Sequence, residues 1–244
     1  MGLGALALAA LLPACSSGRD GTDQVTLDVF AAASLTDALW EIGGAYREAH
    51  PEVTLRFNFA SSSSLATQVN EGAPADVFVP ADADVIDLLD AGITGDPVVV
   101  ATNRLEIIVE SGNPQGIATL ADLARPGLDV VLAAPEVPVG AYAREVLARA
   151  GVRVSPRSLE SNVKAVVTKV VLGEADAGIV YSTDVLAVGE RGTGVPIPSE
   201  QNVVAVYSAA VLRDAAHAAQ AADFVNFLGS ERARAILERY GFGT

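Results

Sequence analysis

The sequence predicts an α/β protein of two lobes, each a mainly parallel sheet flanked by helices, with a ligand cleft between the lobes. Strand-like runs alternate with helix-like runs along most of the 244 residues, which is typical of doubly wound sheets. The alternation comes in two successive sets of roughly 100 residues, the size of a modest domain. Hydrophobic residues make up 50% of the chain and charged residues 19%, which is enough for one large core or two modest ones.

The first set begins with an alternating strand and a helix that has an apolar stripe. The stripe consists of Leu35, Leu39, Ile42 and Tyr46. Ser34 precedes this helix and Asp37 follows three residues later, which predicts a capping box. The expected strands of this set are 25–30, 53–59 and 75–79, and the expected helices are 35–50, 64–70 and 84–91.

The second set repeats the pattern and ends in two helices. Strands are expected at 105–109, 128–133, 178–181 and 203–207, and helices at 120–124, 140–150, 163–172, 215–228 and 231–240. Gly140 opens one of these helices, and its missing side chain is expected to let a ligand approach the backbone. Ser161 or Asn162 is expected to cap the helix that begins near Val163.

The N-terminal residues have the composition of an export signal. Residues 2–14 are uncharged and mostly apolar, and they are too few for a transmembrane helix, which needs about 20 residues. Leu12-Pro13-Ala14-Cys15 resembles a bacterial lipobox, so residues 1–15 are predicted to be a lipoprotein signal peptide. Cys15 would then carry the lipid that anchors the chain to the membrane, with residues 16–24 as a flexible tether. The alternative is an ordinary secretory signal with an incidental cysteine, and both alternatives predict an exported protein at the cell surface or in the periplasm.

Composition argues against several classes of protein. The net charge of −14 and only 16 Lys and Arg residues disfavour a nucleic-acid partner. One cysteine and two histidines leave no cluster for a zinc site. The sequence has neither a Cys or His nucleophile–base pair nor a Gly-x-Ser-x-Gly elbow, so we expect no enzyme and no cofactor.

Two serine-bearing turns, each between a strand and a helix, suggest capture of a small anion. They are 30–37, with Ser34, and 59–66, with a run of four serines at 61–64. A hydroxyl at a helix start lies beside backbone N–H groups that have no partner within the helix. The helix starts near Gly140 and Val163 would bring the total to four, each with a partial charge of roughly +0.5. Their sum of about +2 would balance a dianion.

Six ordered blocks resemble the molybdate-binding proteins of bacterial ABC importers. They are 30–38, 59–78, 137–143, 162–164, 178–184 and 240–242. The resemblance implies a type II periplasmic-binding-protein fold, with lobe I formed by residues 25–101 and 206–244 and lobe II by residues 102–205. It places the two C-terminal helices on lobe I.

The same resemblance implies which residues hold the oxyanion. They are Ser34 and Ser62 through side chain and N–H, Val139 and Val163 through N–H, and Tyr181 through its hydroxyl. Ser61 and Ser63 are alternatives to Ser62. The metal is bound only as the oxyanion, with no direct protein ligand.

The implied function is capture of molybdate and tungstate by a monomer that delivers them to the membrane permease of an ABC importer. The alternatives are another ligand on the same fold, such as sulfate or a small organic acid, and an enzyme on a similar bilobed scaffold. We expect Lys164 to solvate its helix rather than touch the anion. Asp76 and Asp184 are expected to bind backbone groups.

Overall fold

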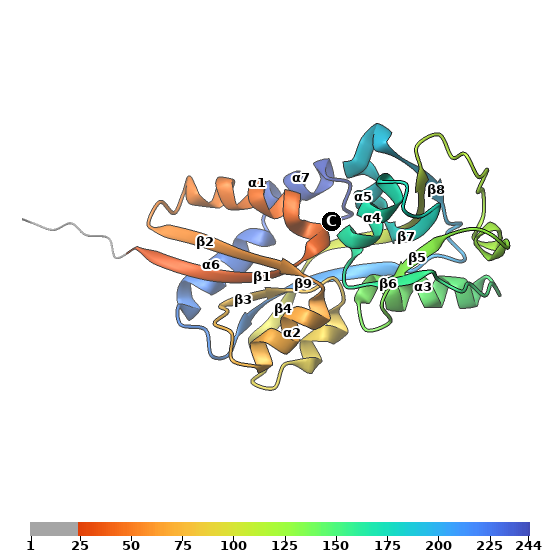
Figure 1. The fold of residues 1–244 in the computed structure, drawn as a ribbon. Coiled ribbons are helices and arrows are strands. Elements are labelled where there is room, and N and C mark those ends of the chain that lie inside the picture. The colour runs from red at the N-terminus through yellow and green to blue at the C-terminus, as the bar shows by residue number, and fades with distance from the viewer. Residues whose placement is uncertain (1–23) are drawn as a thin grey trace, which may run out of the picture.

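The computed structural model describes residues 24–244, and the element labels below are those of Figure 1. The predicted signal peptide, the lipidation site Cys15 and residues 16–23 of the predicted tether lie outside the described residues.

Two groups of parallel strands form the ends of one nine-stranded sheet, which confirms the predicted α/β class. At one end β1 (Val25–Ala32) pairs in parallel with β2 (Val53–Ala60) and β3 (Val77–Val79). At the other end β5 (Val130–Ala133) pairs in parallel with β6 (Ser158–Glu160) and β7 (Ala177–Tyr181). The strand order is β2-β1-β3-β9-β4-β7-β5-β6, and β8 (Gly192–Pro196) pairs with β4.

Two long antiparallel strands in the middle of the sheet connect the two ends. They are β4 (Ile93–Glu110) and β9 (Val204–Leu212). Strand β4 pairs with β9 as far as Arg104 and then, from Leu105, with β7 and β8. The chain therefore passes between the lobes within these strands (Figure 1). The boundaries at residues 101 and 205, which remain a prediction, lie in this stretch.

Sequence patterning finds only the last part of β4, at 105–109. The earlier residues 93–104 contain Pro97, and the pairing with β9 is irregular on both sides of Val98 and Val99. Much of that segment is exposed, so the alternation of buried and exposed residues is lost there. Strands β6 and β8 are also missing from the prediction, because they are short and lack an apolar run.

Helices cover the sheet at both ends, and most begin close to the predicted positions. They are α1 (Thr36–Arg47), α2 (Ser62–Asn70), α3 (Pro138–Arg149), α4 (Val163–Val171), α5 (Ser182–Val188), α6 (Ala218–Leu228) and α7 (Glu231–Arg239). The expected helix 84–91 is a 3-10 helix at Ala83–Leu88, and α5 was not predicted. Short 3-10 helices also occupy Ala33–Leu35, Leu120–Ala124 and Gly189–Arg191.

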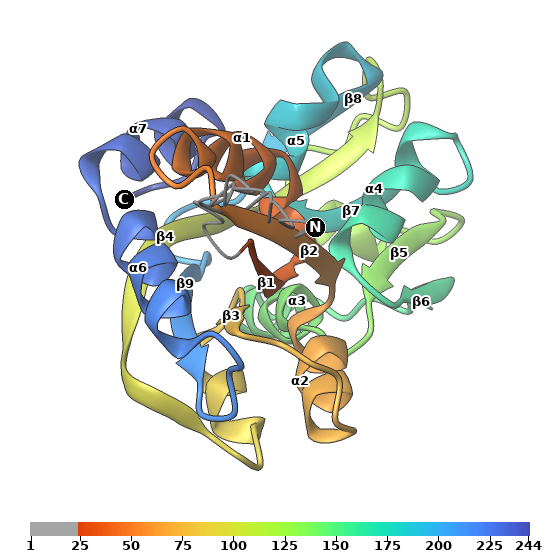
Figure 2. The ribbon, with the colours of Figure 1, turned by 90° about the vertical axis from the view of Figure 1, so that its left-hand side faces the viewer.

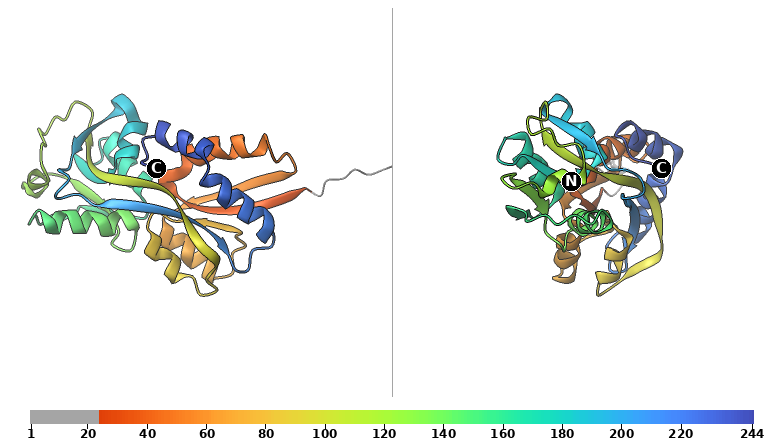
Figure 3. Two further views of the ribbon diagram at one scale, coloured as in Figure 1. Left: turned by 180° about the vertical axis from the view of Figure 1, so that it is seen from behind. Right: turned by 90° about the vertical axis from the view of Figure 1, so that its right-hand side faces the viewer.

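The C-terminal helices lie beside α1 at the β1–β3 end of the sheet (Figures 2 and 3). The predicted apolar stripe of α1 is confirmed, because Leu35, Leu39, Ile42 and Tyr46 are each at most 1% exposed. The ring of Tyr46 packs edge-on against Phe224 of α6, with ring centroids 5.0 Å apart. This apolar contact fixes the C-terminal segment to the first lobe.

Gly140 is needed for packing within the chain rather than for ligand approach. A Cβ atom at this position would lie 2.0 Å from the carbonyl oxygen of Ala134 and 2.5 Å from that of Ala133. The first turn of α3 therefore sits directly on the end of β5. The expectation that Gly140 leaves room for a ligand is wrong, because the chain's own carbonyls fill that space.

Gly140→Ala should lower the free energy of unfolding by about 1–3 kcal/mol, because the new methyl group overlaps backbone that cannot move away freely. Gly44→Ala is the matched control, since a Cβ there meets nothing within 4 Å and lies in helix α1. The control should gain about 0.5–1 kcal/mol from helix propensity. Urea unfolding of both variants measures the difference, and equal effects would contradict the packing role.

Candidate functional site

A small cavity lies between the two lobes and is lined by residues of both. Its volume is about 20 Å³, and all five residues implied by the resemblance line it: Ser34, Ser62, Val139, Val163 and Tyr181. The other lining residues are Ala32, Ala33, Ala60, Ser61, Ala81, Val137, Pro138 and Asn162. The fold thus brings the predicted residues together, and their role toward a ligand remains a prediction.

Ser34 lies in the 3-10 turn between β1 and α1, and it does not cap the helix. The N-cap of α1 is Leu35, without a side-chain bond, so the predicted capping box with Asp37 is wrong. The extra turn moves the helix start to Thr36 and directs the Ser34 hydroxyl inward. There its Oγ lies 3.0 Å from Oη of Tyr207.

The run of serines divides into a cap and a free donor. Ser61 is the N-cap of α2: its Oγ accepts from the Ser64 N–H and donates to the Ser64 hydroxyl. Ser62 is 1% exposed, and its Oγ accepts from the Ala81 N–H at 2.9 Å. Because Ser62 already accepts a bond, its own proton is available to a ligand, whereas the hydroxyl of Ser61 is engaged. Ser63 does not line the cavity.

Two helix N-termini of the second lobe supply backbone donors. Proline at the first position of α3 has no N–H, so Val139 carries the first N–H of that helix. Val163 is the first residue of α4, and Asn162 is its cap, accepting from the Ala165 N–H at 3.0 Å. The first N–H groups of a helix have no intrahelical partner, and both Val139 and Val163 line the cavity.

Tyr181 ends β7 with a hydroxyl that lacks a partner. It is 2% exposed, and its Oη has no hydrogen-bond partner among residues 24–244. Burial, with smaller contributions from the neighbouring tyrosines and Asp184, raises the pKa of Tyr181 well above its ordinary value. The group therefore stays protonated and is a donor to whatever enters the cavity.

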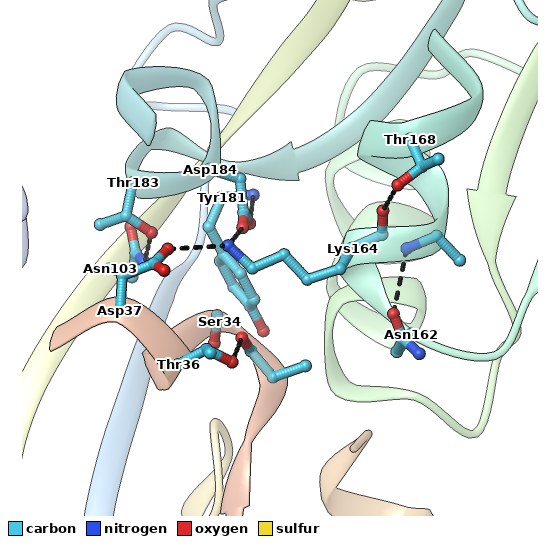
Figure 4. A network of polar contacts seen from close by, with 12 residues as sticks. Ser34, Thr36, Asp37, Asn103, Asn162, Lys164, Thr168, Tyr181, Thr183 and Asp184 are labelled. Carbon is cyan, nitrogen blue, oxygen red and sulfur yellow. Dashed lines mark hydrogen bonds and ion pairs between the residues drawn. The ribbon is translucent and has the colours of Figure 1, made fainter. Parts of the chain in front are cut away.

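No charged side chain of the described residues lines the cavity. The nearby Lys164 is held by two carboxylates, with Nζ 3.6 Å from Oδ2 of Asp37 and 3.3 Å from Oδ1 of Asp184 (Figure 4). Asp37 belongs to α1 and Lys164 to α4, so this ion pair joins the two lobes. The expected solvation of the helix by Lys164 is therefore replaced by pairing with these carboxylates.

Both buried aspartates singled out in the sequence bind backbone groups, as predicted. Asp76 accepts from the N–H groups of Asp28 and His217. Asp184 accepts from the Tyr181 N–H at 3.3 Å. Burial raises the pKa of Asp184 to about 6, although the charge of Lys164 opposes that shift.

Residues 27–243 match the family described as bacterial extracellular solute-binding protein. The chain belongs to this family. It is also 40% identical to the molybdate-binding protein ModA of Mycobacterium tuberculosis, and the match covers 99% of this chain and 96% of that protein. These matches bear out the resemblance stated from the sequence.

Solved structures with the same fold include two oxyanion-binding proteins. The periplasmic molybdate-binding protein of Azotobacter vinelandii superposes with a TM-score of 0.78 at 21% identity, covering 89% of this chain and 99% of that one. The sulfate-binding protein SubI of M. tuberculosis superposes with a TM-score of 0.80 at 19% identity, covering 89% of this chain and 86% of that one. At these identities the likeness establishes the bilobed fold alone.

None of the helices in residues 24–244 combines the length and apolarity needed to cross a bilayer. No group of three or more His, Cys, Asp or Glu side chains in that range is placed to hold a metal ion.

Asp184→Asn should change how stability depends on pH. The pKa of Asp184 is raised from 3.8 to about 6, so between these values the folded chain binds a proton that the unfolded chain does not. This carboxyl therefore makes the wild-type protein less stable as pH rises through that window. The free energy of unfolding of the variant minus that of the wild type should increase from pH 4 to pH 6. Denaturant unfolding across this range measures it, and a constant difference would contradict the assignment.

Proposed function

We propose that this protein captures molybdate, and the nearly equal-sized tungstate, outside the cytoplasmic membrane for import by an ABC transporter. The observation that carries the proposal is the convergence of residues with uncharged donor groups from both lobes on one cavity. The 40% identity to ModA over nearly the whole chain supports molybdate as the ligand.

The donor set suits a fully deprotonated tetrahedral dianion, which offers acceptors only. Hydrogen bonds to a charged group contribute roughly 1.5–3 kcal/mol each. Several of them, reduced by desolvation and by the ordering of the lobes, are consistent with the −8 to −12 kcal/mol of micromolar to nanomolar binding. The helix N-termini supply the compensating positive potential without a cationic side chain. That local potential would outweigh the repulsion expected from a net charge of −14.

The distribution of donors links binding to closure. Ser34 and Ser62 belong to the first lobe, and Val139, Val163 and Tyr181 to the second. Because only the closed form satisfies all acceptors of the anion, the ligand shifts the population toward that form. The ion pair of Lys164 with Asp37 forms only when the lobes approach each other, and it supports the same state. We propose that the permease recognises the closed protein.

The alternatives fit the cavity less well. Phosphate near neutral pH carries a proton, which would lack an acceptor among these donors. A small organic acid would be expected to meet an arginine fork, and no arginine lines the cavity among the described residues. Sulfate has the right charge, but it is smaller and would leave its hydrogen bonds long. A binding role without catalysis is consistent with membership in a family of solute-binding proteins.

We further propose that Cys15 is lipidated and holds the protein at the membrane as a monomer. Incorporation of a labelled fatty acid, and its loss in Cys15→Ala, would test the anchor.

Molybdate and tungstate should each raise the melting temperature of the purified protein, because a ligand that binds only the folded state stabilises it by mass action. At about 1,000 times the Kd, the gain is about 4 kcal/mol. Sulfate and phosphate at the same concentration should give smaller shifts, and calorimetry should rank the four ligands in the same order. Absence of a shift at millimolar molybdate and tungstate, or a larger shift with sulfate, would overturn the proposal.

Tyr181→Phe should weaken molybdate binding by about 1–2 kcal/mol while leaving the ligand-free protein equally or more stable. The reason is that the hydroxyl has no hydrogen-bond partner among residues 24–244, so its removal costs the folded state no hydrogen bond within that range. Calorimetry and denaturant unfolding together separate the two effects. A destabilised variant with unchanged affinity would instead identify Tyr181 as a core residue only.

A further inference from the structure

A chain of buried polar groups starts at Ser34 and leads away from the cavity. The groups beyond Ser34 have no role in the proposed function as described above. Tyr207 of β9 is fully buried and does not line the cavity, yet its Oη lies 3.0 Å from the Ser34 Oγ. On its other side, Oη lies 3.5 Å from Nδ2 of Asn103 in β4. The chain therefore runs from the strands that connect the lobes to the wall of the cavity.

The orientation of the Asn103 amide is fixed by its partners. Its Oδ1 accepts from the Arg104 N–H at 2.9 Å and from the Ser182 hydroxyl at 3.0 Å. A backbone N–H is always a donor, so the oxygen of the amide must lie on that side. The amide nitrogen then faces Thr183, with Nδ2 2.9 Å from Oγ1, and Tyr207.

The direction of each hydrogen bond follows from that orientation. Asn103 donates one proton to Thr183 and the other to Tyr207, so the Tyr207 oxygen acts as acceptor on that side. When Tyr207 donates its own proton to the Ser34 oxygen, Asn103, Tyr207 and Ser34 are all satisfied at once. Burial, the largest influence, raises the pKa of the Tyr207 hydroxyl, so this proton is not lost near neutral pH. In that arrangement Ser34 accepts from Tyr207, and its own proton is left for a ligand in the cavity that Ser34 lines.

We propose that Tyr207 is a positioning residue for specificity: by donating to the Ser34 oxygen it turns the Ser34 proton into the cavity, which favours fully deprotonated oxyanions over protonated ones. This inference rests on the proposed function, because it concerns the same oxyanion site. A serine without this neighbour can either donate or accept. In this site Tyr207 takes one of the two lone pairs of the Ser34 oxygen, as the Ala81 N–H takes one of those of Ser62. The proton of each hydroxyl is left for a ligand in the cavity.

The test is a double-mutant cycle on Ser34→Ala and Tyr207→Phe, with calorimetric titration of molybdate, sulfate and phosphate at pH 7.5. Tyr207→Phe alone should weaken molybdate and sulfate binding about fivefold to tenfold, the size expected for one hydrogen bond. Phosphate, which carries a proton at this pH, should bind as well as or better than to the wild type. The preference for molybdate over phosphate should therefore narrow about tenfold.

In the Ser34→Ala background the same change should have almost no effect, within about twofold, because Tyr207 acts only through Ser34. Tyr46→Phe is the matched control: it removes a buried tyrosine hydroxyl at a site away from the cavity and should leave all three affinities unchanged. Equal weakening by Tyr207→Phe in both backgrounds, or parallel weakening for phosphate and molybdate, would overturn the proposal.

A second variant covers the case in which Tyr207→Phe fails to fold. Asn103→Asp keeps the shape of the side chain but puts an acceptor opposite Tyr207, which turns the Tyr207 proton away from Ser34. This variant should also narrow the preference for molybdate over phosphate, although Tyr207 is still present. An unchanged preference would contradict the proposed role of the hydrogen bonds from Asn103 through Tyr207 to Ser34.

If the wild-type protein binds neither molybdate nor tungstate, the proposed function fails and this inference fails with it. If the wild type binds molybdate and Ser34→Ala weakens that binding, but the effects of Ser34→Ala and Tyr207→Phe simply add, the proposed function stands and only the role of Tyr207 is wrong.

Discussion

The antiparallel pair formed by β4 and β9 is the constraint on which the site depends. Each lobe has its own parallel strands, and the helices that follow β1, β2, β5 and β7 begin at the carboxyl ends of those strands. Such ends form a binding site only if the two lobes face each other across a cleft. Strand β4 pairs with β9 in the first part of the sheet and with β7 and β8 in the second, and it holds the lobes in that relation.

The electrostatics of the site follow from this geometry. A chain with a net charge of −14 repels anions at long range, but the first N–H groups of several helices would act on a bound anion at contact distance. Lys164, which follows the lining residue Val163, is paired with Asp37 and Asp184 and does not line the cavity. The cavity therefore discriminates by donor geometry and by the absence of acceptors rather than by net charge. The buried residues Tyr181 and Tyr207 act in the same way, because their raised pKa keeps both hydroxyls protonated and therefore able to donate.

Much of the fold was predictable from residue patterns. The stripe of Leu35, Leu39, Ile42 and Tyr46 gave α1, and strand-like runs located β1, β2, β5 and β7, because those elements bury one face or both in a regular order. The first twelve residues of β4 were not predicted as a strand, because Pro97 and the irregular pairing near Val98 break the alternation of buried and exposed residues. The capping box at Ser34 and Asp37 was wrong for a related reason. A sequence spacing of three fits a cap, but one inserted 3-10 turn moves the helix start and leaves the serine free.

The sequence alone was sufficient for the fold class, through the alternation of strands and helices, and for the family, through six ordered motifs. Five of the residues that line the cavity followed from that resemblance, because its motifs lie at strand–helix junctions. The tertiary structure alone distinguished Ser61, a cap, from Ser62, a free donor, since that choice depends on the Ala81 N–H, 19 residues away. It alone gave the pairing of Lys164 with Asp37 and the contact of Tyr207 with Ser34, which joins residues 173 positions apart. A hydrogen bond between distant segments leaves no trace in the spacing of either one. Its partners are brought within 3 Å only by the way β4 and β9 cross between the lobes.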